Sequence, residues 1–195
     1  MSNKKIVKKT VGLIIIAVGL GILLSSIGLN IRQSIVKKKT VEEFKEYIES
    51  GEAFTEEGGN PAVEGDVIAI LRIPSIDSEN PVREGVTKSV LSDSLGHDMT
   101  TALPGTEGNS VIAGHRNYTF GKFFNRLDEV EVDDLIYVDT ATQTYTYAVT
   151  EIKTVEPDDL SVLEPVEGKE QLTLYTCTPI YIASHRLVII AERIQ

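Results

Sequence analysis

The stretch LTLYTCTPIYIASHRLVII, residues 172–190, holds the only cysteine of the chain between two segments of strand character. Cys177 ends the run LTLYT, and Arg186 opens the run RLVII nine positions later. Thr178 and Pro179 follow the thiol directly, and proline is confined to the ends, edges and bulges of strands. We therefore expect Cys177 at the rim of a sheet.

Similar strand-like segments occur throughout about residues 64–195. Short apolar or alternating runs, rich in Val, Ile, Tyr and Thr, are separated by turn residues: DVIAILRI, NSVIAG, DLIYV and YTYAVTEI. This pattern is typical of an antiparallel β sandwich or barrel. Tyr145, Tyr147 and Val149 alternate with polar residues, which predicts a strand with one wet face. GKFFNRLDEV has a more helical composition, so we expect a mainly β domain with short helices.

A different segment precedes this domain. After a basic tail, residues 1–10, residues 11–29 read VGLIIIAVGLGILLSSIGL and carry no charge. Nineteen residues of helix span roughly 30 Å, the thickness of the hydrocarbon layer, so a retained transmembrane anchor is predicted. A cleaved signal peptide, with small residues at Ser26 and Gly28, and a buried soluble helix are the alternatives.

Residues 30–63 are predicted to be a helical stalk and linker. Val41, Phe44 and Ile48 form an apolar stripe at helical spacing, and GEAFTEEGGNPAVEG has the composition of a flexible linker. An arm that covers the active site is the alternative.

Charge is divided sharply between the two parts. Residues 1–39 contain eight basic and no acidic residues, so the other 11 of the 19 basic residues face all 29 acidic ones, a net charge of −18. Nucleic-acid binding requires cationic groups on the protein, which argues against that partner. The basic N-terminal segment instead suits anionic lipid head groups of a cell membrane.

A thiol at a strand rim becomes reactive beside a suitable partner. His115 closes the run NSVIAGH, so it also stands at a strand end, and Arg186 opens another strand. Three strand ends that meet at the mouth of a barrel would form an acyl-transfer site: the thiolate attacks a carbonyl, the imidazolium protonates the leaving amine and the guanidinium faces the oxyanion. A structural cysteine is the rival interpretation.

These residues resemble the motifs of the sortases, the membrane-anchored cysteine transpeptidases of Gram-positive bacteria. TLYTC is similar to their TLxTC signature, AGHR to their histidine motif, and the arginine of SHRLVI has the family's spacing from the cysteine. The resemblance implies an eight-stranded β barrel, the catalytic set His115, Cys177 and Arg186, Thr176 as an oxyanion neighbour, and no metal or other cofactor.

The resemblance also implies the reaction and its place. Sortases cleave an LPxTG-like sorting signal after Thr through a thioacyl intermediate, and pass the protein to an amine of a peptidoglycan precursor or of another pilin. Such substrates lie outside the membrane, so we expect a cytoplasmic N-terminus and an extracellular catalytic domain.

Among the sortase classes, class D fits best. TCTP, HRNYTFGKFFNRLDEV and the short segment between Val155 and Gln171 favour it, while class A, class C and class E remain alternatives. A pilin-polymerising class C enzyme usually has a lid with an Asp-Pro-aromatic motif, which is missing before Asp66. IYIAS, after Pro179, departs from the Tyr-Gly that we associate with TCTP.

The remaining motifs and histidines are interpreted without a catalytic role. LPGTEG, residues 103–108, is a Pro/Gly loop, His97 a loop histidine with a local hydrogen bond, His185 a residue facing away from the site, and Arg116 a surface or rim residue. Calcium binding by the acidic segment EPDDLSVLEPVEGKE is a minor alternative. A hydrolase, and a non-catalytic tethered β domain acting as an adhesin or receptor, are the rival functions.

Overall fold

The computed structural model describes residues 2–50, 63–116 and 123–194. Within them, eight strands form the domain: β1 (Val67–Ile73), β2 (Ser78–Glu84), β3 (Leu95–His97), β4 (Gly108–Ala113), β5 (Leu135–Thr140), β6 (Thr144–Val155), β7 (Glu170–Thr178) and β8 (His185–Arg193). The helices are α1 (Ser2–Ser50), α2 (Lys88–Leu91) and the 3-10 helices η1 (Pro74–Ile76), η2 (Leu127–Glu129) and η3 (Leu160–Leu163).

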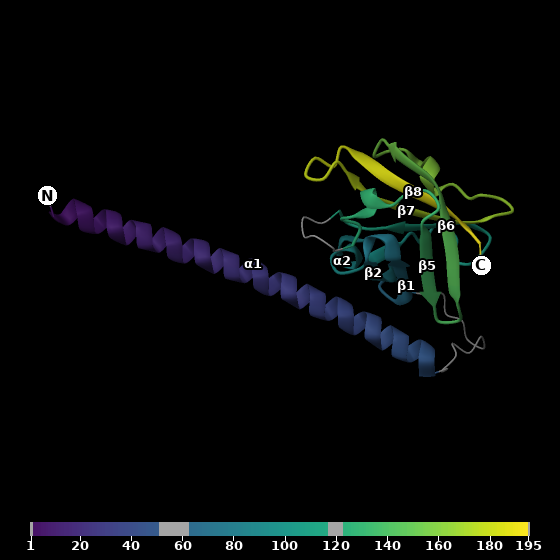
Figure 1. Ribbon diagram of the computed structural model, residues 1–195, viewed down its shortest axis with the longest axis horizontal. Coiled ribbons are helices and arrows are strands. Elements are labelled where there is room, and N and C mark those ends of the chain that lie inside the picture. Colours follow the sequence, from purple (N-terminus) through teal and green to yellow (C-terminus); the bar gives the residue numbers. More distant parts are fainter. Residues whose placement is uncertain (1, 51–62, 117–122, 195) are drawn as a thin grey trace. The chain divides into compact units, whose positions relative to one another are not determined.

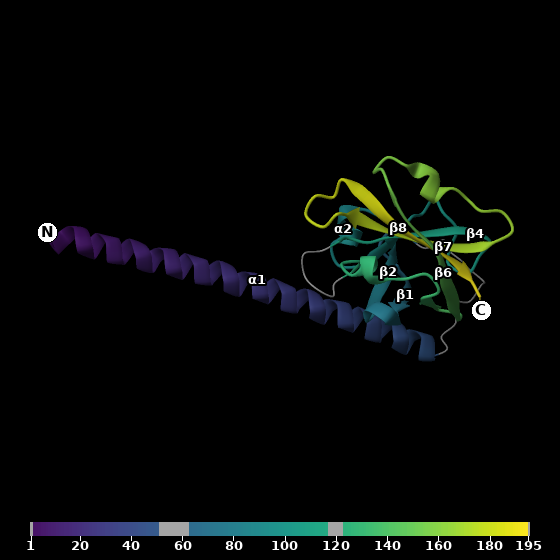
Figure 2. The same cartoon turned by 45° about the horizontal axis from the view of Figure 1, so that its top comes forward.

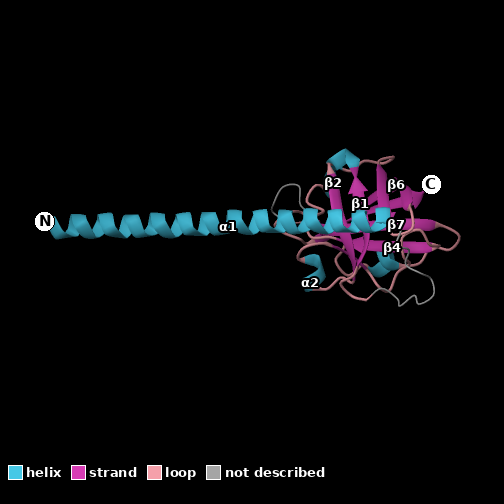
Figure 3. Cartoon of the chain, turned by 90° about the horizontal axis from the view of Figure 1, so that it is seen from below, coloured by secondary structure: helices cyan, strands magenta, loops and turns pink. Residues whose placement is uncertain are grey.

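The strands close into a barrel in the order β1-β2-β3-β4-β7-β8-β6-β5. Figures 1 and 2 show the strands of this domain from two directions. This confirms the eight-stranded barrel, and the predominance of strands in the domain is plain in Figure 3. The expectation of an antiparallel sheet was incomplete, because β2 pairs with β3 and β4 with β7 in parallel. The second of these parallel pairs carries the candidate site.

The barrel interior is filled by apolar side chains from all eight strands. Strand β3 contributes Leu95, but not its glycine or histidine. Leu71, Ile112, Leu172 and Ile189 are among the fully buried residues of one continuous core. All six residues of β4 are buried, which explains why NSVIA reads as an unbroken apolar run. In β6 the predicted alternation holds, since Tyr145, Tyr147 and Val149 are buried while the residues between them are not.

Two strands escape sequence-based prediction. β2 reads SENPVRE, whose polar residues and Pro81 argue against a strand, yet Pro81 pairs with Ile70 and is buried. β3 has only three residues. The described part of GKFFNRLDEV contains the short helix η2, in agreement with the expected short helices; Asn117 to Lys122 lie outside the described residues.

Helix α1 contains a segment that is long and apolar enough to cross a membrane. The chain divides into two compact units at residues 38 and 39, and each is described by itself. In the second unit the last turns of α1 pack on the barrel wall: Val41 and Phe44 are buried against Ile70 of β1. Lys45 Nζ also contacts Glu79 Oε1 at 2.6 Å. The predicted stalk is therefore helical to Ser50, and residues 51–62 of the predicted linker lie outside the described residues.

This packing does not fit the alternative of an arm over the active site. Ile70 belongs to β1, and four strand steps separate β1 from β7 in either direction around the closed barrel. The helix thus packs on the wall opposite to the strand that carries Cys177.

Candidate active site

Cys177 and Arg186 are brought together by the pairing of β7 with β8. The two strands are antiparallel, and Cys177 is the direct cross-strand partner of Arg186. Residues paired in this way present their side chains on the same face of a sheet. Figure 2 shows β7 and β8 lying side by side. The expectation that both residues stand at strand ends is confirmed.

Both side chains belong to the outer face of the barrel. Leu172 and Leu174 of β7 point into the core, so the alternation of a strand directs Tyr175 and Cys177 outward. The Cys177 side chain is partly exposed. Tyr175 lies on the same face, and its burial raises the pKa of its phenol. The site therefore lies on the outer wall near the strand ends, whereas the sequence led us to expect the barrel mouth.

His115 follows β4, the other neighbour of β7. Ala113 pairs with Tyr175 in parallel register, and Gly114 N donates to Tyr175 O at 3.1 Å. Continuing that register by two residues brings His115 level with Cys177. Gly114 is required just before the histidine, because a Cβ there would come within 2.5 Å of the Phe124 ring.

A groove of about 310 Å³ joins these residues. Its lining comprises His115, Arg116, Cys177, Pro179, Ile180, Tyr181 and Ala183. Arg186 is outside this lining; its Nη1 donates to the carbonyl oxygens of His185 at 3.1 Å and Ala183 at 3.4 Å. The structure thus places thiol and imidazole in one groove, with the guanidinium across the strand pair from the thiol.

Thr176 does not meet the expectation of an oxyanion neighbour with its side chain. The residue is 2% exposed, and its Oγ1 donates to Gly114 O at 2.7 Å. It points away from Cys177, because adjacent residues of a strand face opposite sides. The hydroxyl instead ties β7 to the segment that carries His115.

Arg116 is the groove residue whose importance the sequence did not reveal. It was expected at the surface or rim, and it does line the groove, but its side chain is only 8% exposed. Its position in the motif AGHR, directly after the histidine, is the only signal for it in the sequence.

The other two histidines lie elsewhere. His97 is buried in β3, with Nδ1 2.8 Å from Glu84 Oε1 and Nε2 2.9 Å from Ala102 O. It is a strand residue, whereas the sequence suggested a loop. His185 contacts Ser184 Oγ at 2.8 Å and Glu156 Oε1 at 3.3 Å.

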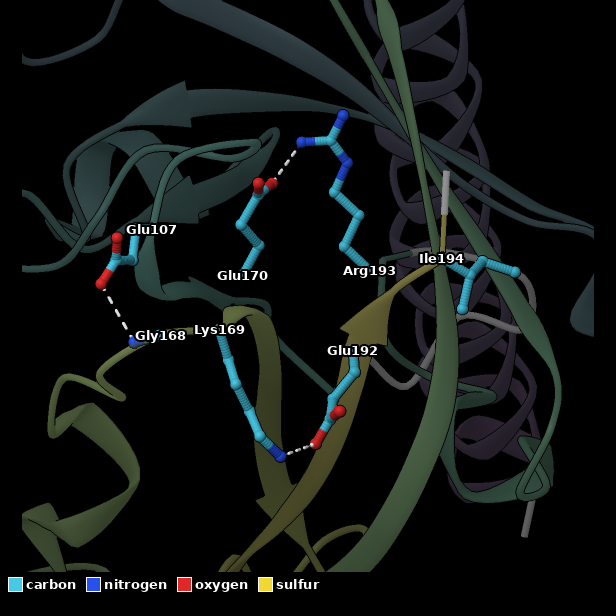
Figure 4. A pocket seen from close by; sticks show the side chains of 7 residues that line it. All are labelled: Glu107, Gly168, Lys169, Glu170, Glu192, Arg193 and Ile194. Atoms are coloured by element: carbon cyan, nitrogen blue, oxygen red, sulfur yellow. Dashed lines mark hydrogen bonds and ion pairs between the residues drawn. The ribbon is translucent and has the colours of Figure 1, made fainter.

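A second, more polar pocket of about 510 Å³ lies where β7 begins and β8 ends, away from the groove (Figure 4). Its charges are paired: Lys169 with Glu192, and Arg193 with Glu170. Glu107 accepts from Gly168 N at 3.0 Å.

Several carboxylates of the acidic segment that leads into β7 have protein partners. Asp159 accepts a hydrogen bond from Ser161 N and caps η3. Glu156 contacts His185, and Glu170 contacts Arg193. No three His, Cys, Asp or Glu side chains converge in a metal-binding group within the described parts of the chain.

Fold and site together define a class of protein. A partly exposed thiol, an imidazole just beyond the end of the neighbouring strand and a guanidinium across the strand pair, all on a closed β barrel, are the groups of a cysteine acyltransferase. The family model for the sortase domain matches residues 71–194. The chain belongs to the sortase family, whose members are cysteine transpeptidases.

Individual relatives agree. Sortase D of Bacillus subtilis is 29% identical over 200 residues, covering 96% of this chain and 99% of that protein. Sortase SrtE1 of Streptomyces coelicolor is 32% identical over 67% of this chain, which spans only 41% of that longer protein. Among solved structures, a Sortase D5 transpeptidase of Clostridium perfringens is 35% identical with a TM-score of 0.73, covering 82% of this chain and 99% of that one.

Proposed function

We propose that this chain is a membrane-anchored sortase that cleaves an LPxTG-like sorting signal after Thr and transfers the protein to an amine of the cell wall. The observation that supports this most directly is the shared groove of His115 and Cys177, with Arg186 in register opposite the thiol.

Each side chain takes one step of the reaction. The Cys177 thiolate attacks the threonine carbonyl and forms a thioacyl intermediate, and the His115 imidazolium protonates the leaving amine. Arg186 faces the developing oxyanion. Its observed bonds use Nη1, so the Nε and Nη2 donors of its planar guanidinium serve the substrate. The incoming amine then attacks the thioester and releases the thiol.

The proposed partners follow from this chemistry. They are surface proteins that carry a sorting signal and the amine of a peptidoglycan precursor. The apolar segment of α1 would anchor the enzyme in the cell membrane with the N-terminus cytoplasmic and the barrel extracellular, where both substrates are found. The reaction as proposed uses protein side chains alone.

Class D is the proposed branch. The Bacillus subtilis Sortase D and the Sortase D5 structure align over nearly their whole lengths. The barrel alone does not discriminate, because a C1 sortase shares it. The alternative of a pilin-polymerising class C enzyme is opposed by the absence of an Asp-Pro-aromatic motif before Asp66.

Mass spectrometry of thioacyl adducts tests the proposal. The purified protein in detergent is mixed with LPxTG, LPxTA and LAxTG peptides, and Cys177→Ala serves as the matched control. We expect a peptide adduct on Cys177 with at least one signal and none in the variant. Release of the adduct by an added amine supports transpeptidation, while release by water alone supports the rival hydrolase. Absence of any adduct, together with binding activity that survives Cys177→Ala, would instead indicate a tethered binding domain.

A further inference from the structure

Arg116 connects the histidine segment to the cysteine strand. It directly follows His115, and its Nη1 donates to Thr178 Oγ1 at 2.9 Å. Thr178 in turn directly follows Cys177 on β7. On its other side the same guanidinium contacts Asp128 Oδ2 through Nη2 at 2.7 Å. The Arg116 side chain thus connects the residue after His115 to Thr178, the residue after Cys177.

This arrangement is costly if it serves stability alone. The Arg116 side chain is 8% exposed, and its Nε is buried without a hydrogen-bond partner among the described residues. Its partner Asp128 has a side chain that is 51% exposed, and an ion pair open to water on one side contributes little stability. The geometry that the guanidinium imposes is a better reason for its presence, because its fork fixes two partners at once.

The histidine needs such a constraint. Strand β4 ends at Ala113, and Gly114 N makes the last bond that connects this segment to the β7 backbone. His115 lies beyond it and is exposed, and its carbonyl oxygen accepts a backbone hydrogen bond from Phe124 N at 3.3 Å. The Thr176 hydroxyl holds the chain before His115, through Gly114 O. The Arg116 guanidinium holds the chain after His115 through its bond to Thr178. His115 therefore lies between two residues, Gly114 and Arg116, that are both bonded to side chains of β7.

We propose that Arg116 is a positioning residue, which fixes His115 relative to Cys177 by bonding to Thr178 on β7 and to Asp128. The inference rests on the proposed function of His115 and Cys177, and it assigns to Arg116 no contact with the reacting atoms. Displacement of a catalytic group by about 1 Å can slow a reaction about 100-fold. Loss of the Arg116 bonds should therefore slow thioacylation while substrate binding stays nearly unchanged.

Kinetics of the full chain in detergent give the first test. Arg116→Gln is expected to lower the rate of thioacyl formation about 10- to 100-fold with little change in KM, and Arg116→Lys to recover only part of the rate. Arg72→Gln is the matched control, since Arg72 is also ion-paired but lies on β1. A wild-type rate in Arg116→Gln, or equal losses in Arg116→Gln and Arg72→Gln, would overturn the proposal.

A double-mutant cycle separates positioning from general stability. Thr178→Val removes the acceptor of the Arg116 bond and keeps the size of the side chain. If Arg116 acts through Thr178, the rate losses of Arg116→Gln and Thr178→Val are not additive. Thermal unfolding of the same variants provides the comparison. Additive rate losses, or losses that simply follow the decrease in Tm, would contradict the proposal.

A final measurement does not depend on turnover. Adjacent strands lie about 4.8 Å apart, within the Cα spacing of about 4.4–6.8 Å that a disulfide requires. With His115→Cys, mild oxidation should therefore form a disulfide to Cys177, and adding Arg116→Gln should slow its formation about tenfold. Equal rates, or no disulfide in either background, would refute the positioning role. Failure of wild-type thioacylation would refute only the proposed function.

Discussion

Cys177 and Arg186 are direct partners across the β7–β8 pair, so the register of two strands determines the distance between thiol and guanidinium. Directly paired residues have Cα atoms typically about 4.5–5.5 Å apart. The pairing extends in unbroken register from Gln171 and Glu192 to Thr178 and His185. A shift by one residue would move every side chain of a strand to the other face, and would separate the pair.

Arg186→Lys is expected to be a poor substitute. Lysine keeps the charge and loses the planar fork that presents several donors in fixed directions. If Arg186 stabilises an oxyanion, its replacement should cost about 2–4 kcal/mol in the chemical step, with KM changed less than kcat. Single-turnover kinetics would measure this. Near wild-type turnover in the lysine variant would show that charge alone suffices.

Cys177→Ala and His115→Ala should each abolish thioacyl formation without unfolding the barrel. Both residues lie at strand ends and retain some exposure, so truncation removes little packing. Adduct formation and thermal unfolding are measured on the same samples. Turnover that survives in Cys177→Ala would disprove the assignment of the thiol, whereas a large decrease in Tm would show that the residue is structural.

The sequence predicts the barrel and most of its strands. Six strands are visible as apolar or alternating runs, and the motifs place Cys177, His115 and Arg186 correctly at strand ends. β2 is hidden because Pro81 and its polar neighbours argue against a strand, and pairing with β1 overrides that local preference. The bonds of Arg116 are hidden because its partners Thr178 and Asp128 meet it only in the folded barrel.

Asp139→Asn should destabilise the protein near neutral pH and lose this effect in acid. Arg72 donates from Nε and Nη2 to the two Asp139 oxygens at 2.6 and 2.8 Å. Burial alone would raise the pKa of Asp139, but its hydrogen bonds to Arg72 and Thr144 lower it overall. A carboxylate with a lowered pKa contributes stability above its unfolded-state pKa, about 3.9, and loses it as pH falls through the folded-state value.

The expected cost is about 1–2 kcal/mol at pH 7, a modest value because the Arg72 side chain is 34% exposed. Denaturant titrations of wild type and variant at pH 7 and at successively lower pH would show the difference in unfolding free energy shrinking below about pH 4. A difference that stays constant across this range would mean that ionisation of Asp139 is not responsible.

Phe44→Ala should weaken the packing of the last turns of α1 on the barrel. Phe44 is 8% exposed and packs with Val41 and Ile70, so its truncation should cost about 1.5–3 kcal/mol. Lys45→Ala, which removes an exposed ion pair, should cost less than about 1 kcal/mol. Thermal unfolding in detergent measures both. Thioacylation should persist in both variants, because this wall is opposite to β7; loss of turnover without loss of stability would favour an arm that reaches the groove.

The largest loss of stability is expected when the buried pair of His97 and Glu84 is broken. Both side chains are at most 5% exposed. His97 Nε2 donates to the Ala102 carbonyl at 2.9 Å, because that carbonyl only accepts, and Nδ1 lies 2.8 Å from Glu84 Oε1. His97→Leu would leave the Glu84 carboxyl group buried without its partner.

The expected cost of His97→Leu is about 3–5 kcal/mol, the range for breaking a buried pair. Adding Glu84→Leu should restore part of the loss, because two apolar residues leave no uncompensated charge. His185→Leu is the matched control, since His185 pairs with an exposed glutamate, and it should change stability by less than about 1 kcal/mol. Chemical denaturation of the three variants at pH 7 measures these differences. If His97→Leu lowers the unfolding free energy as little as His185→Leu does, the pair does not stabilise the strand-to-loop junction that leads into β4.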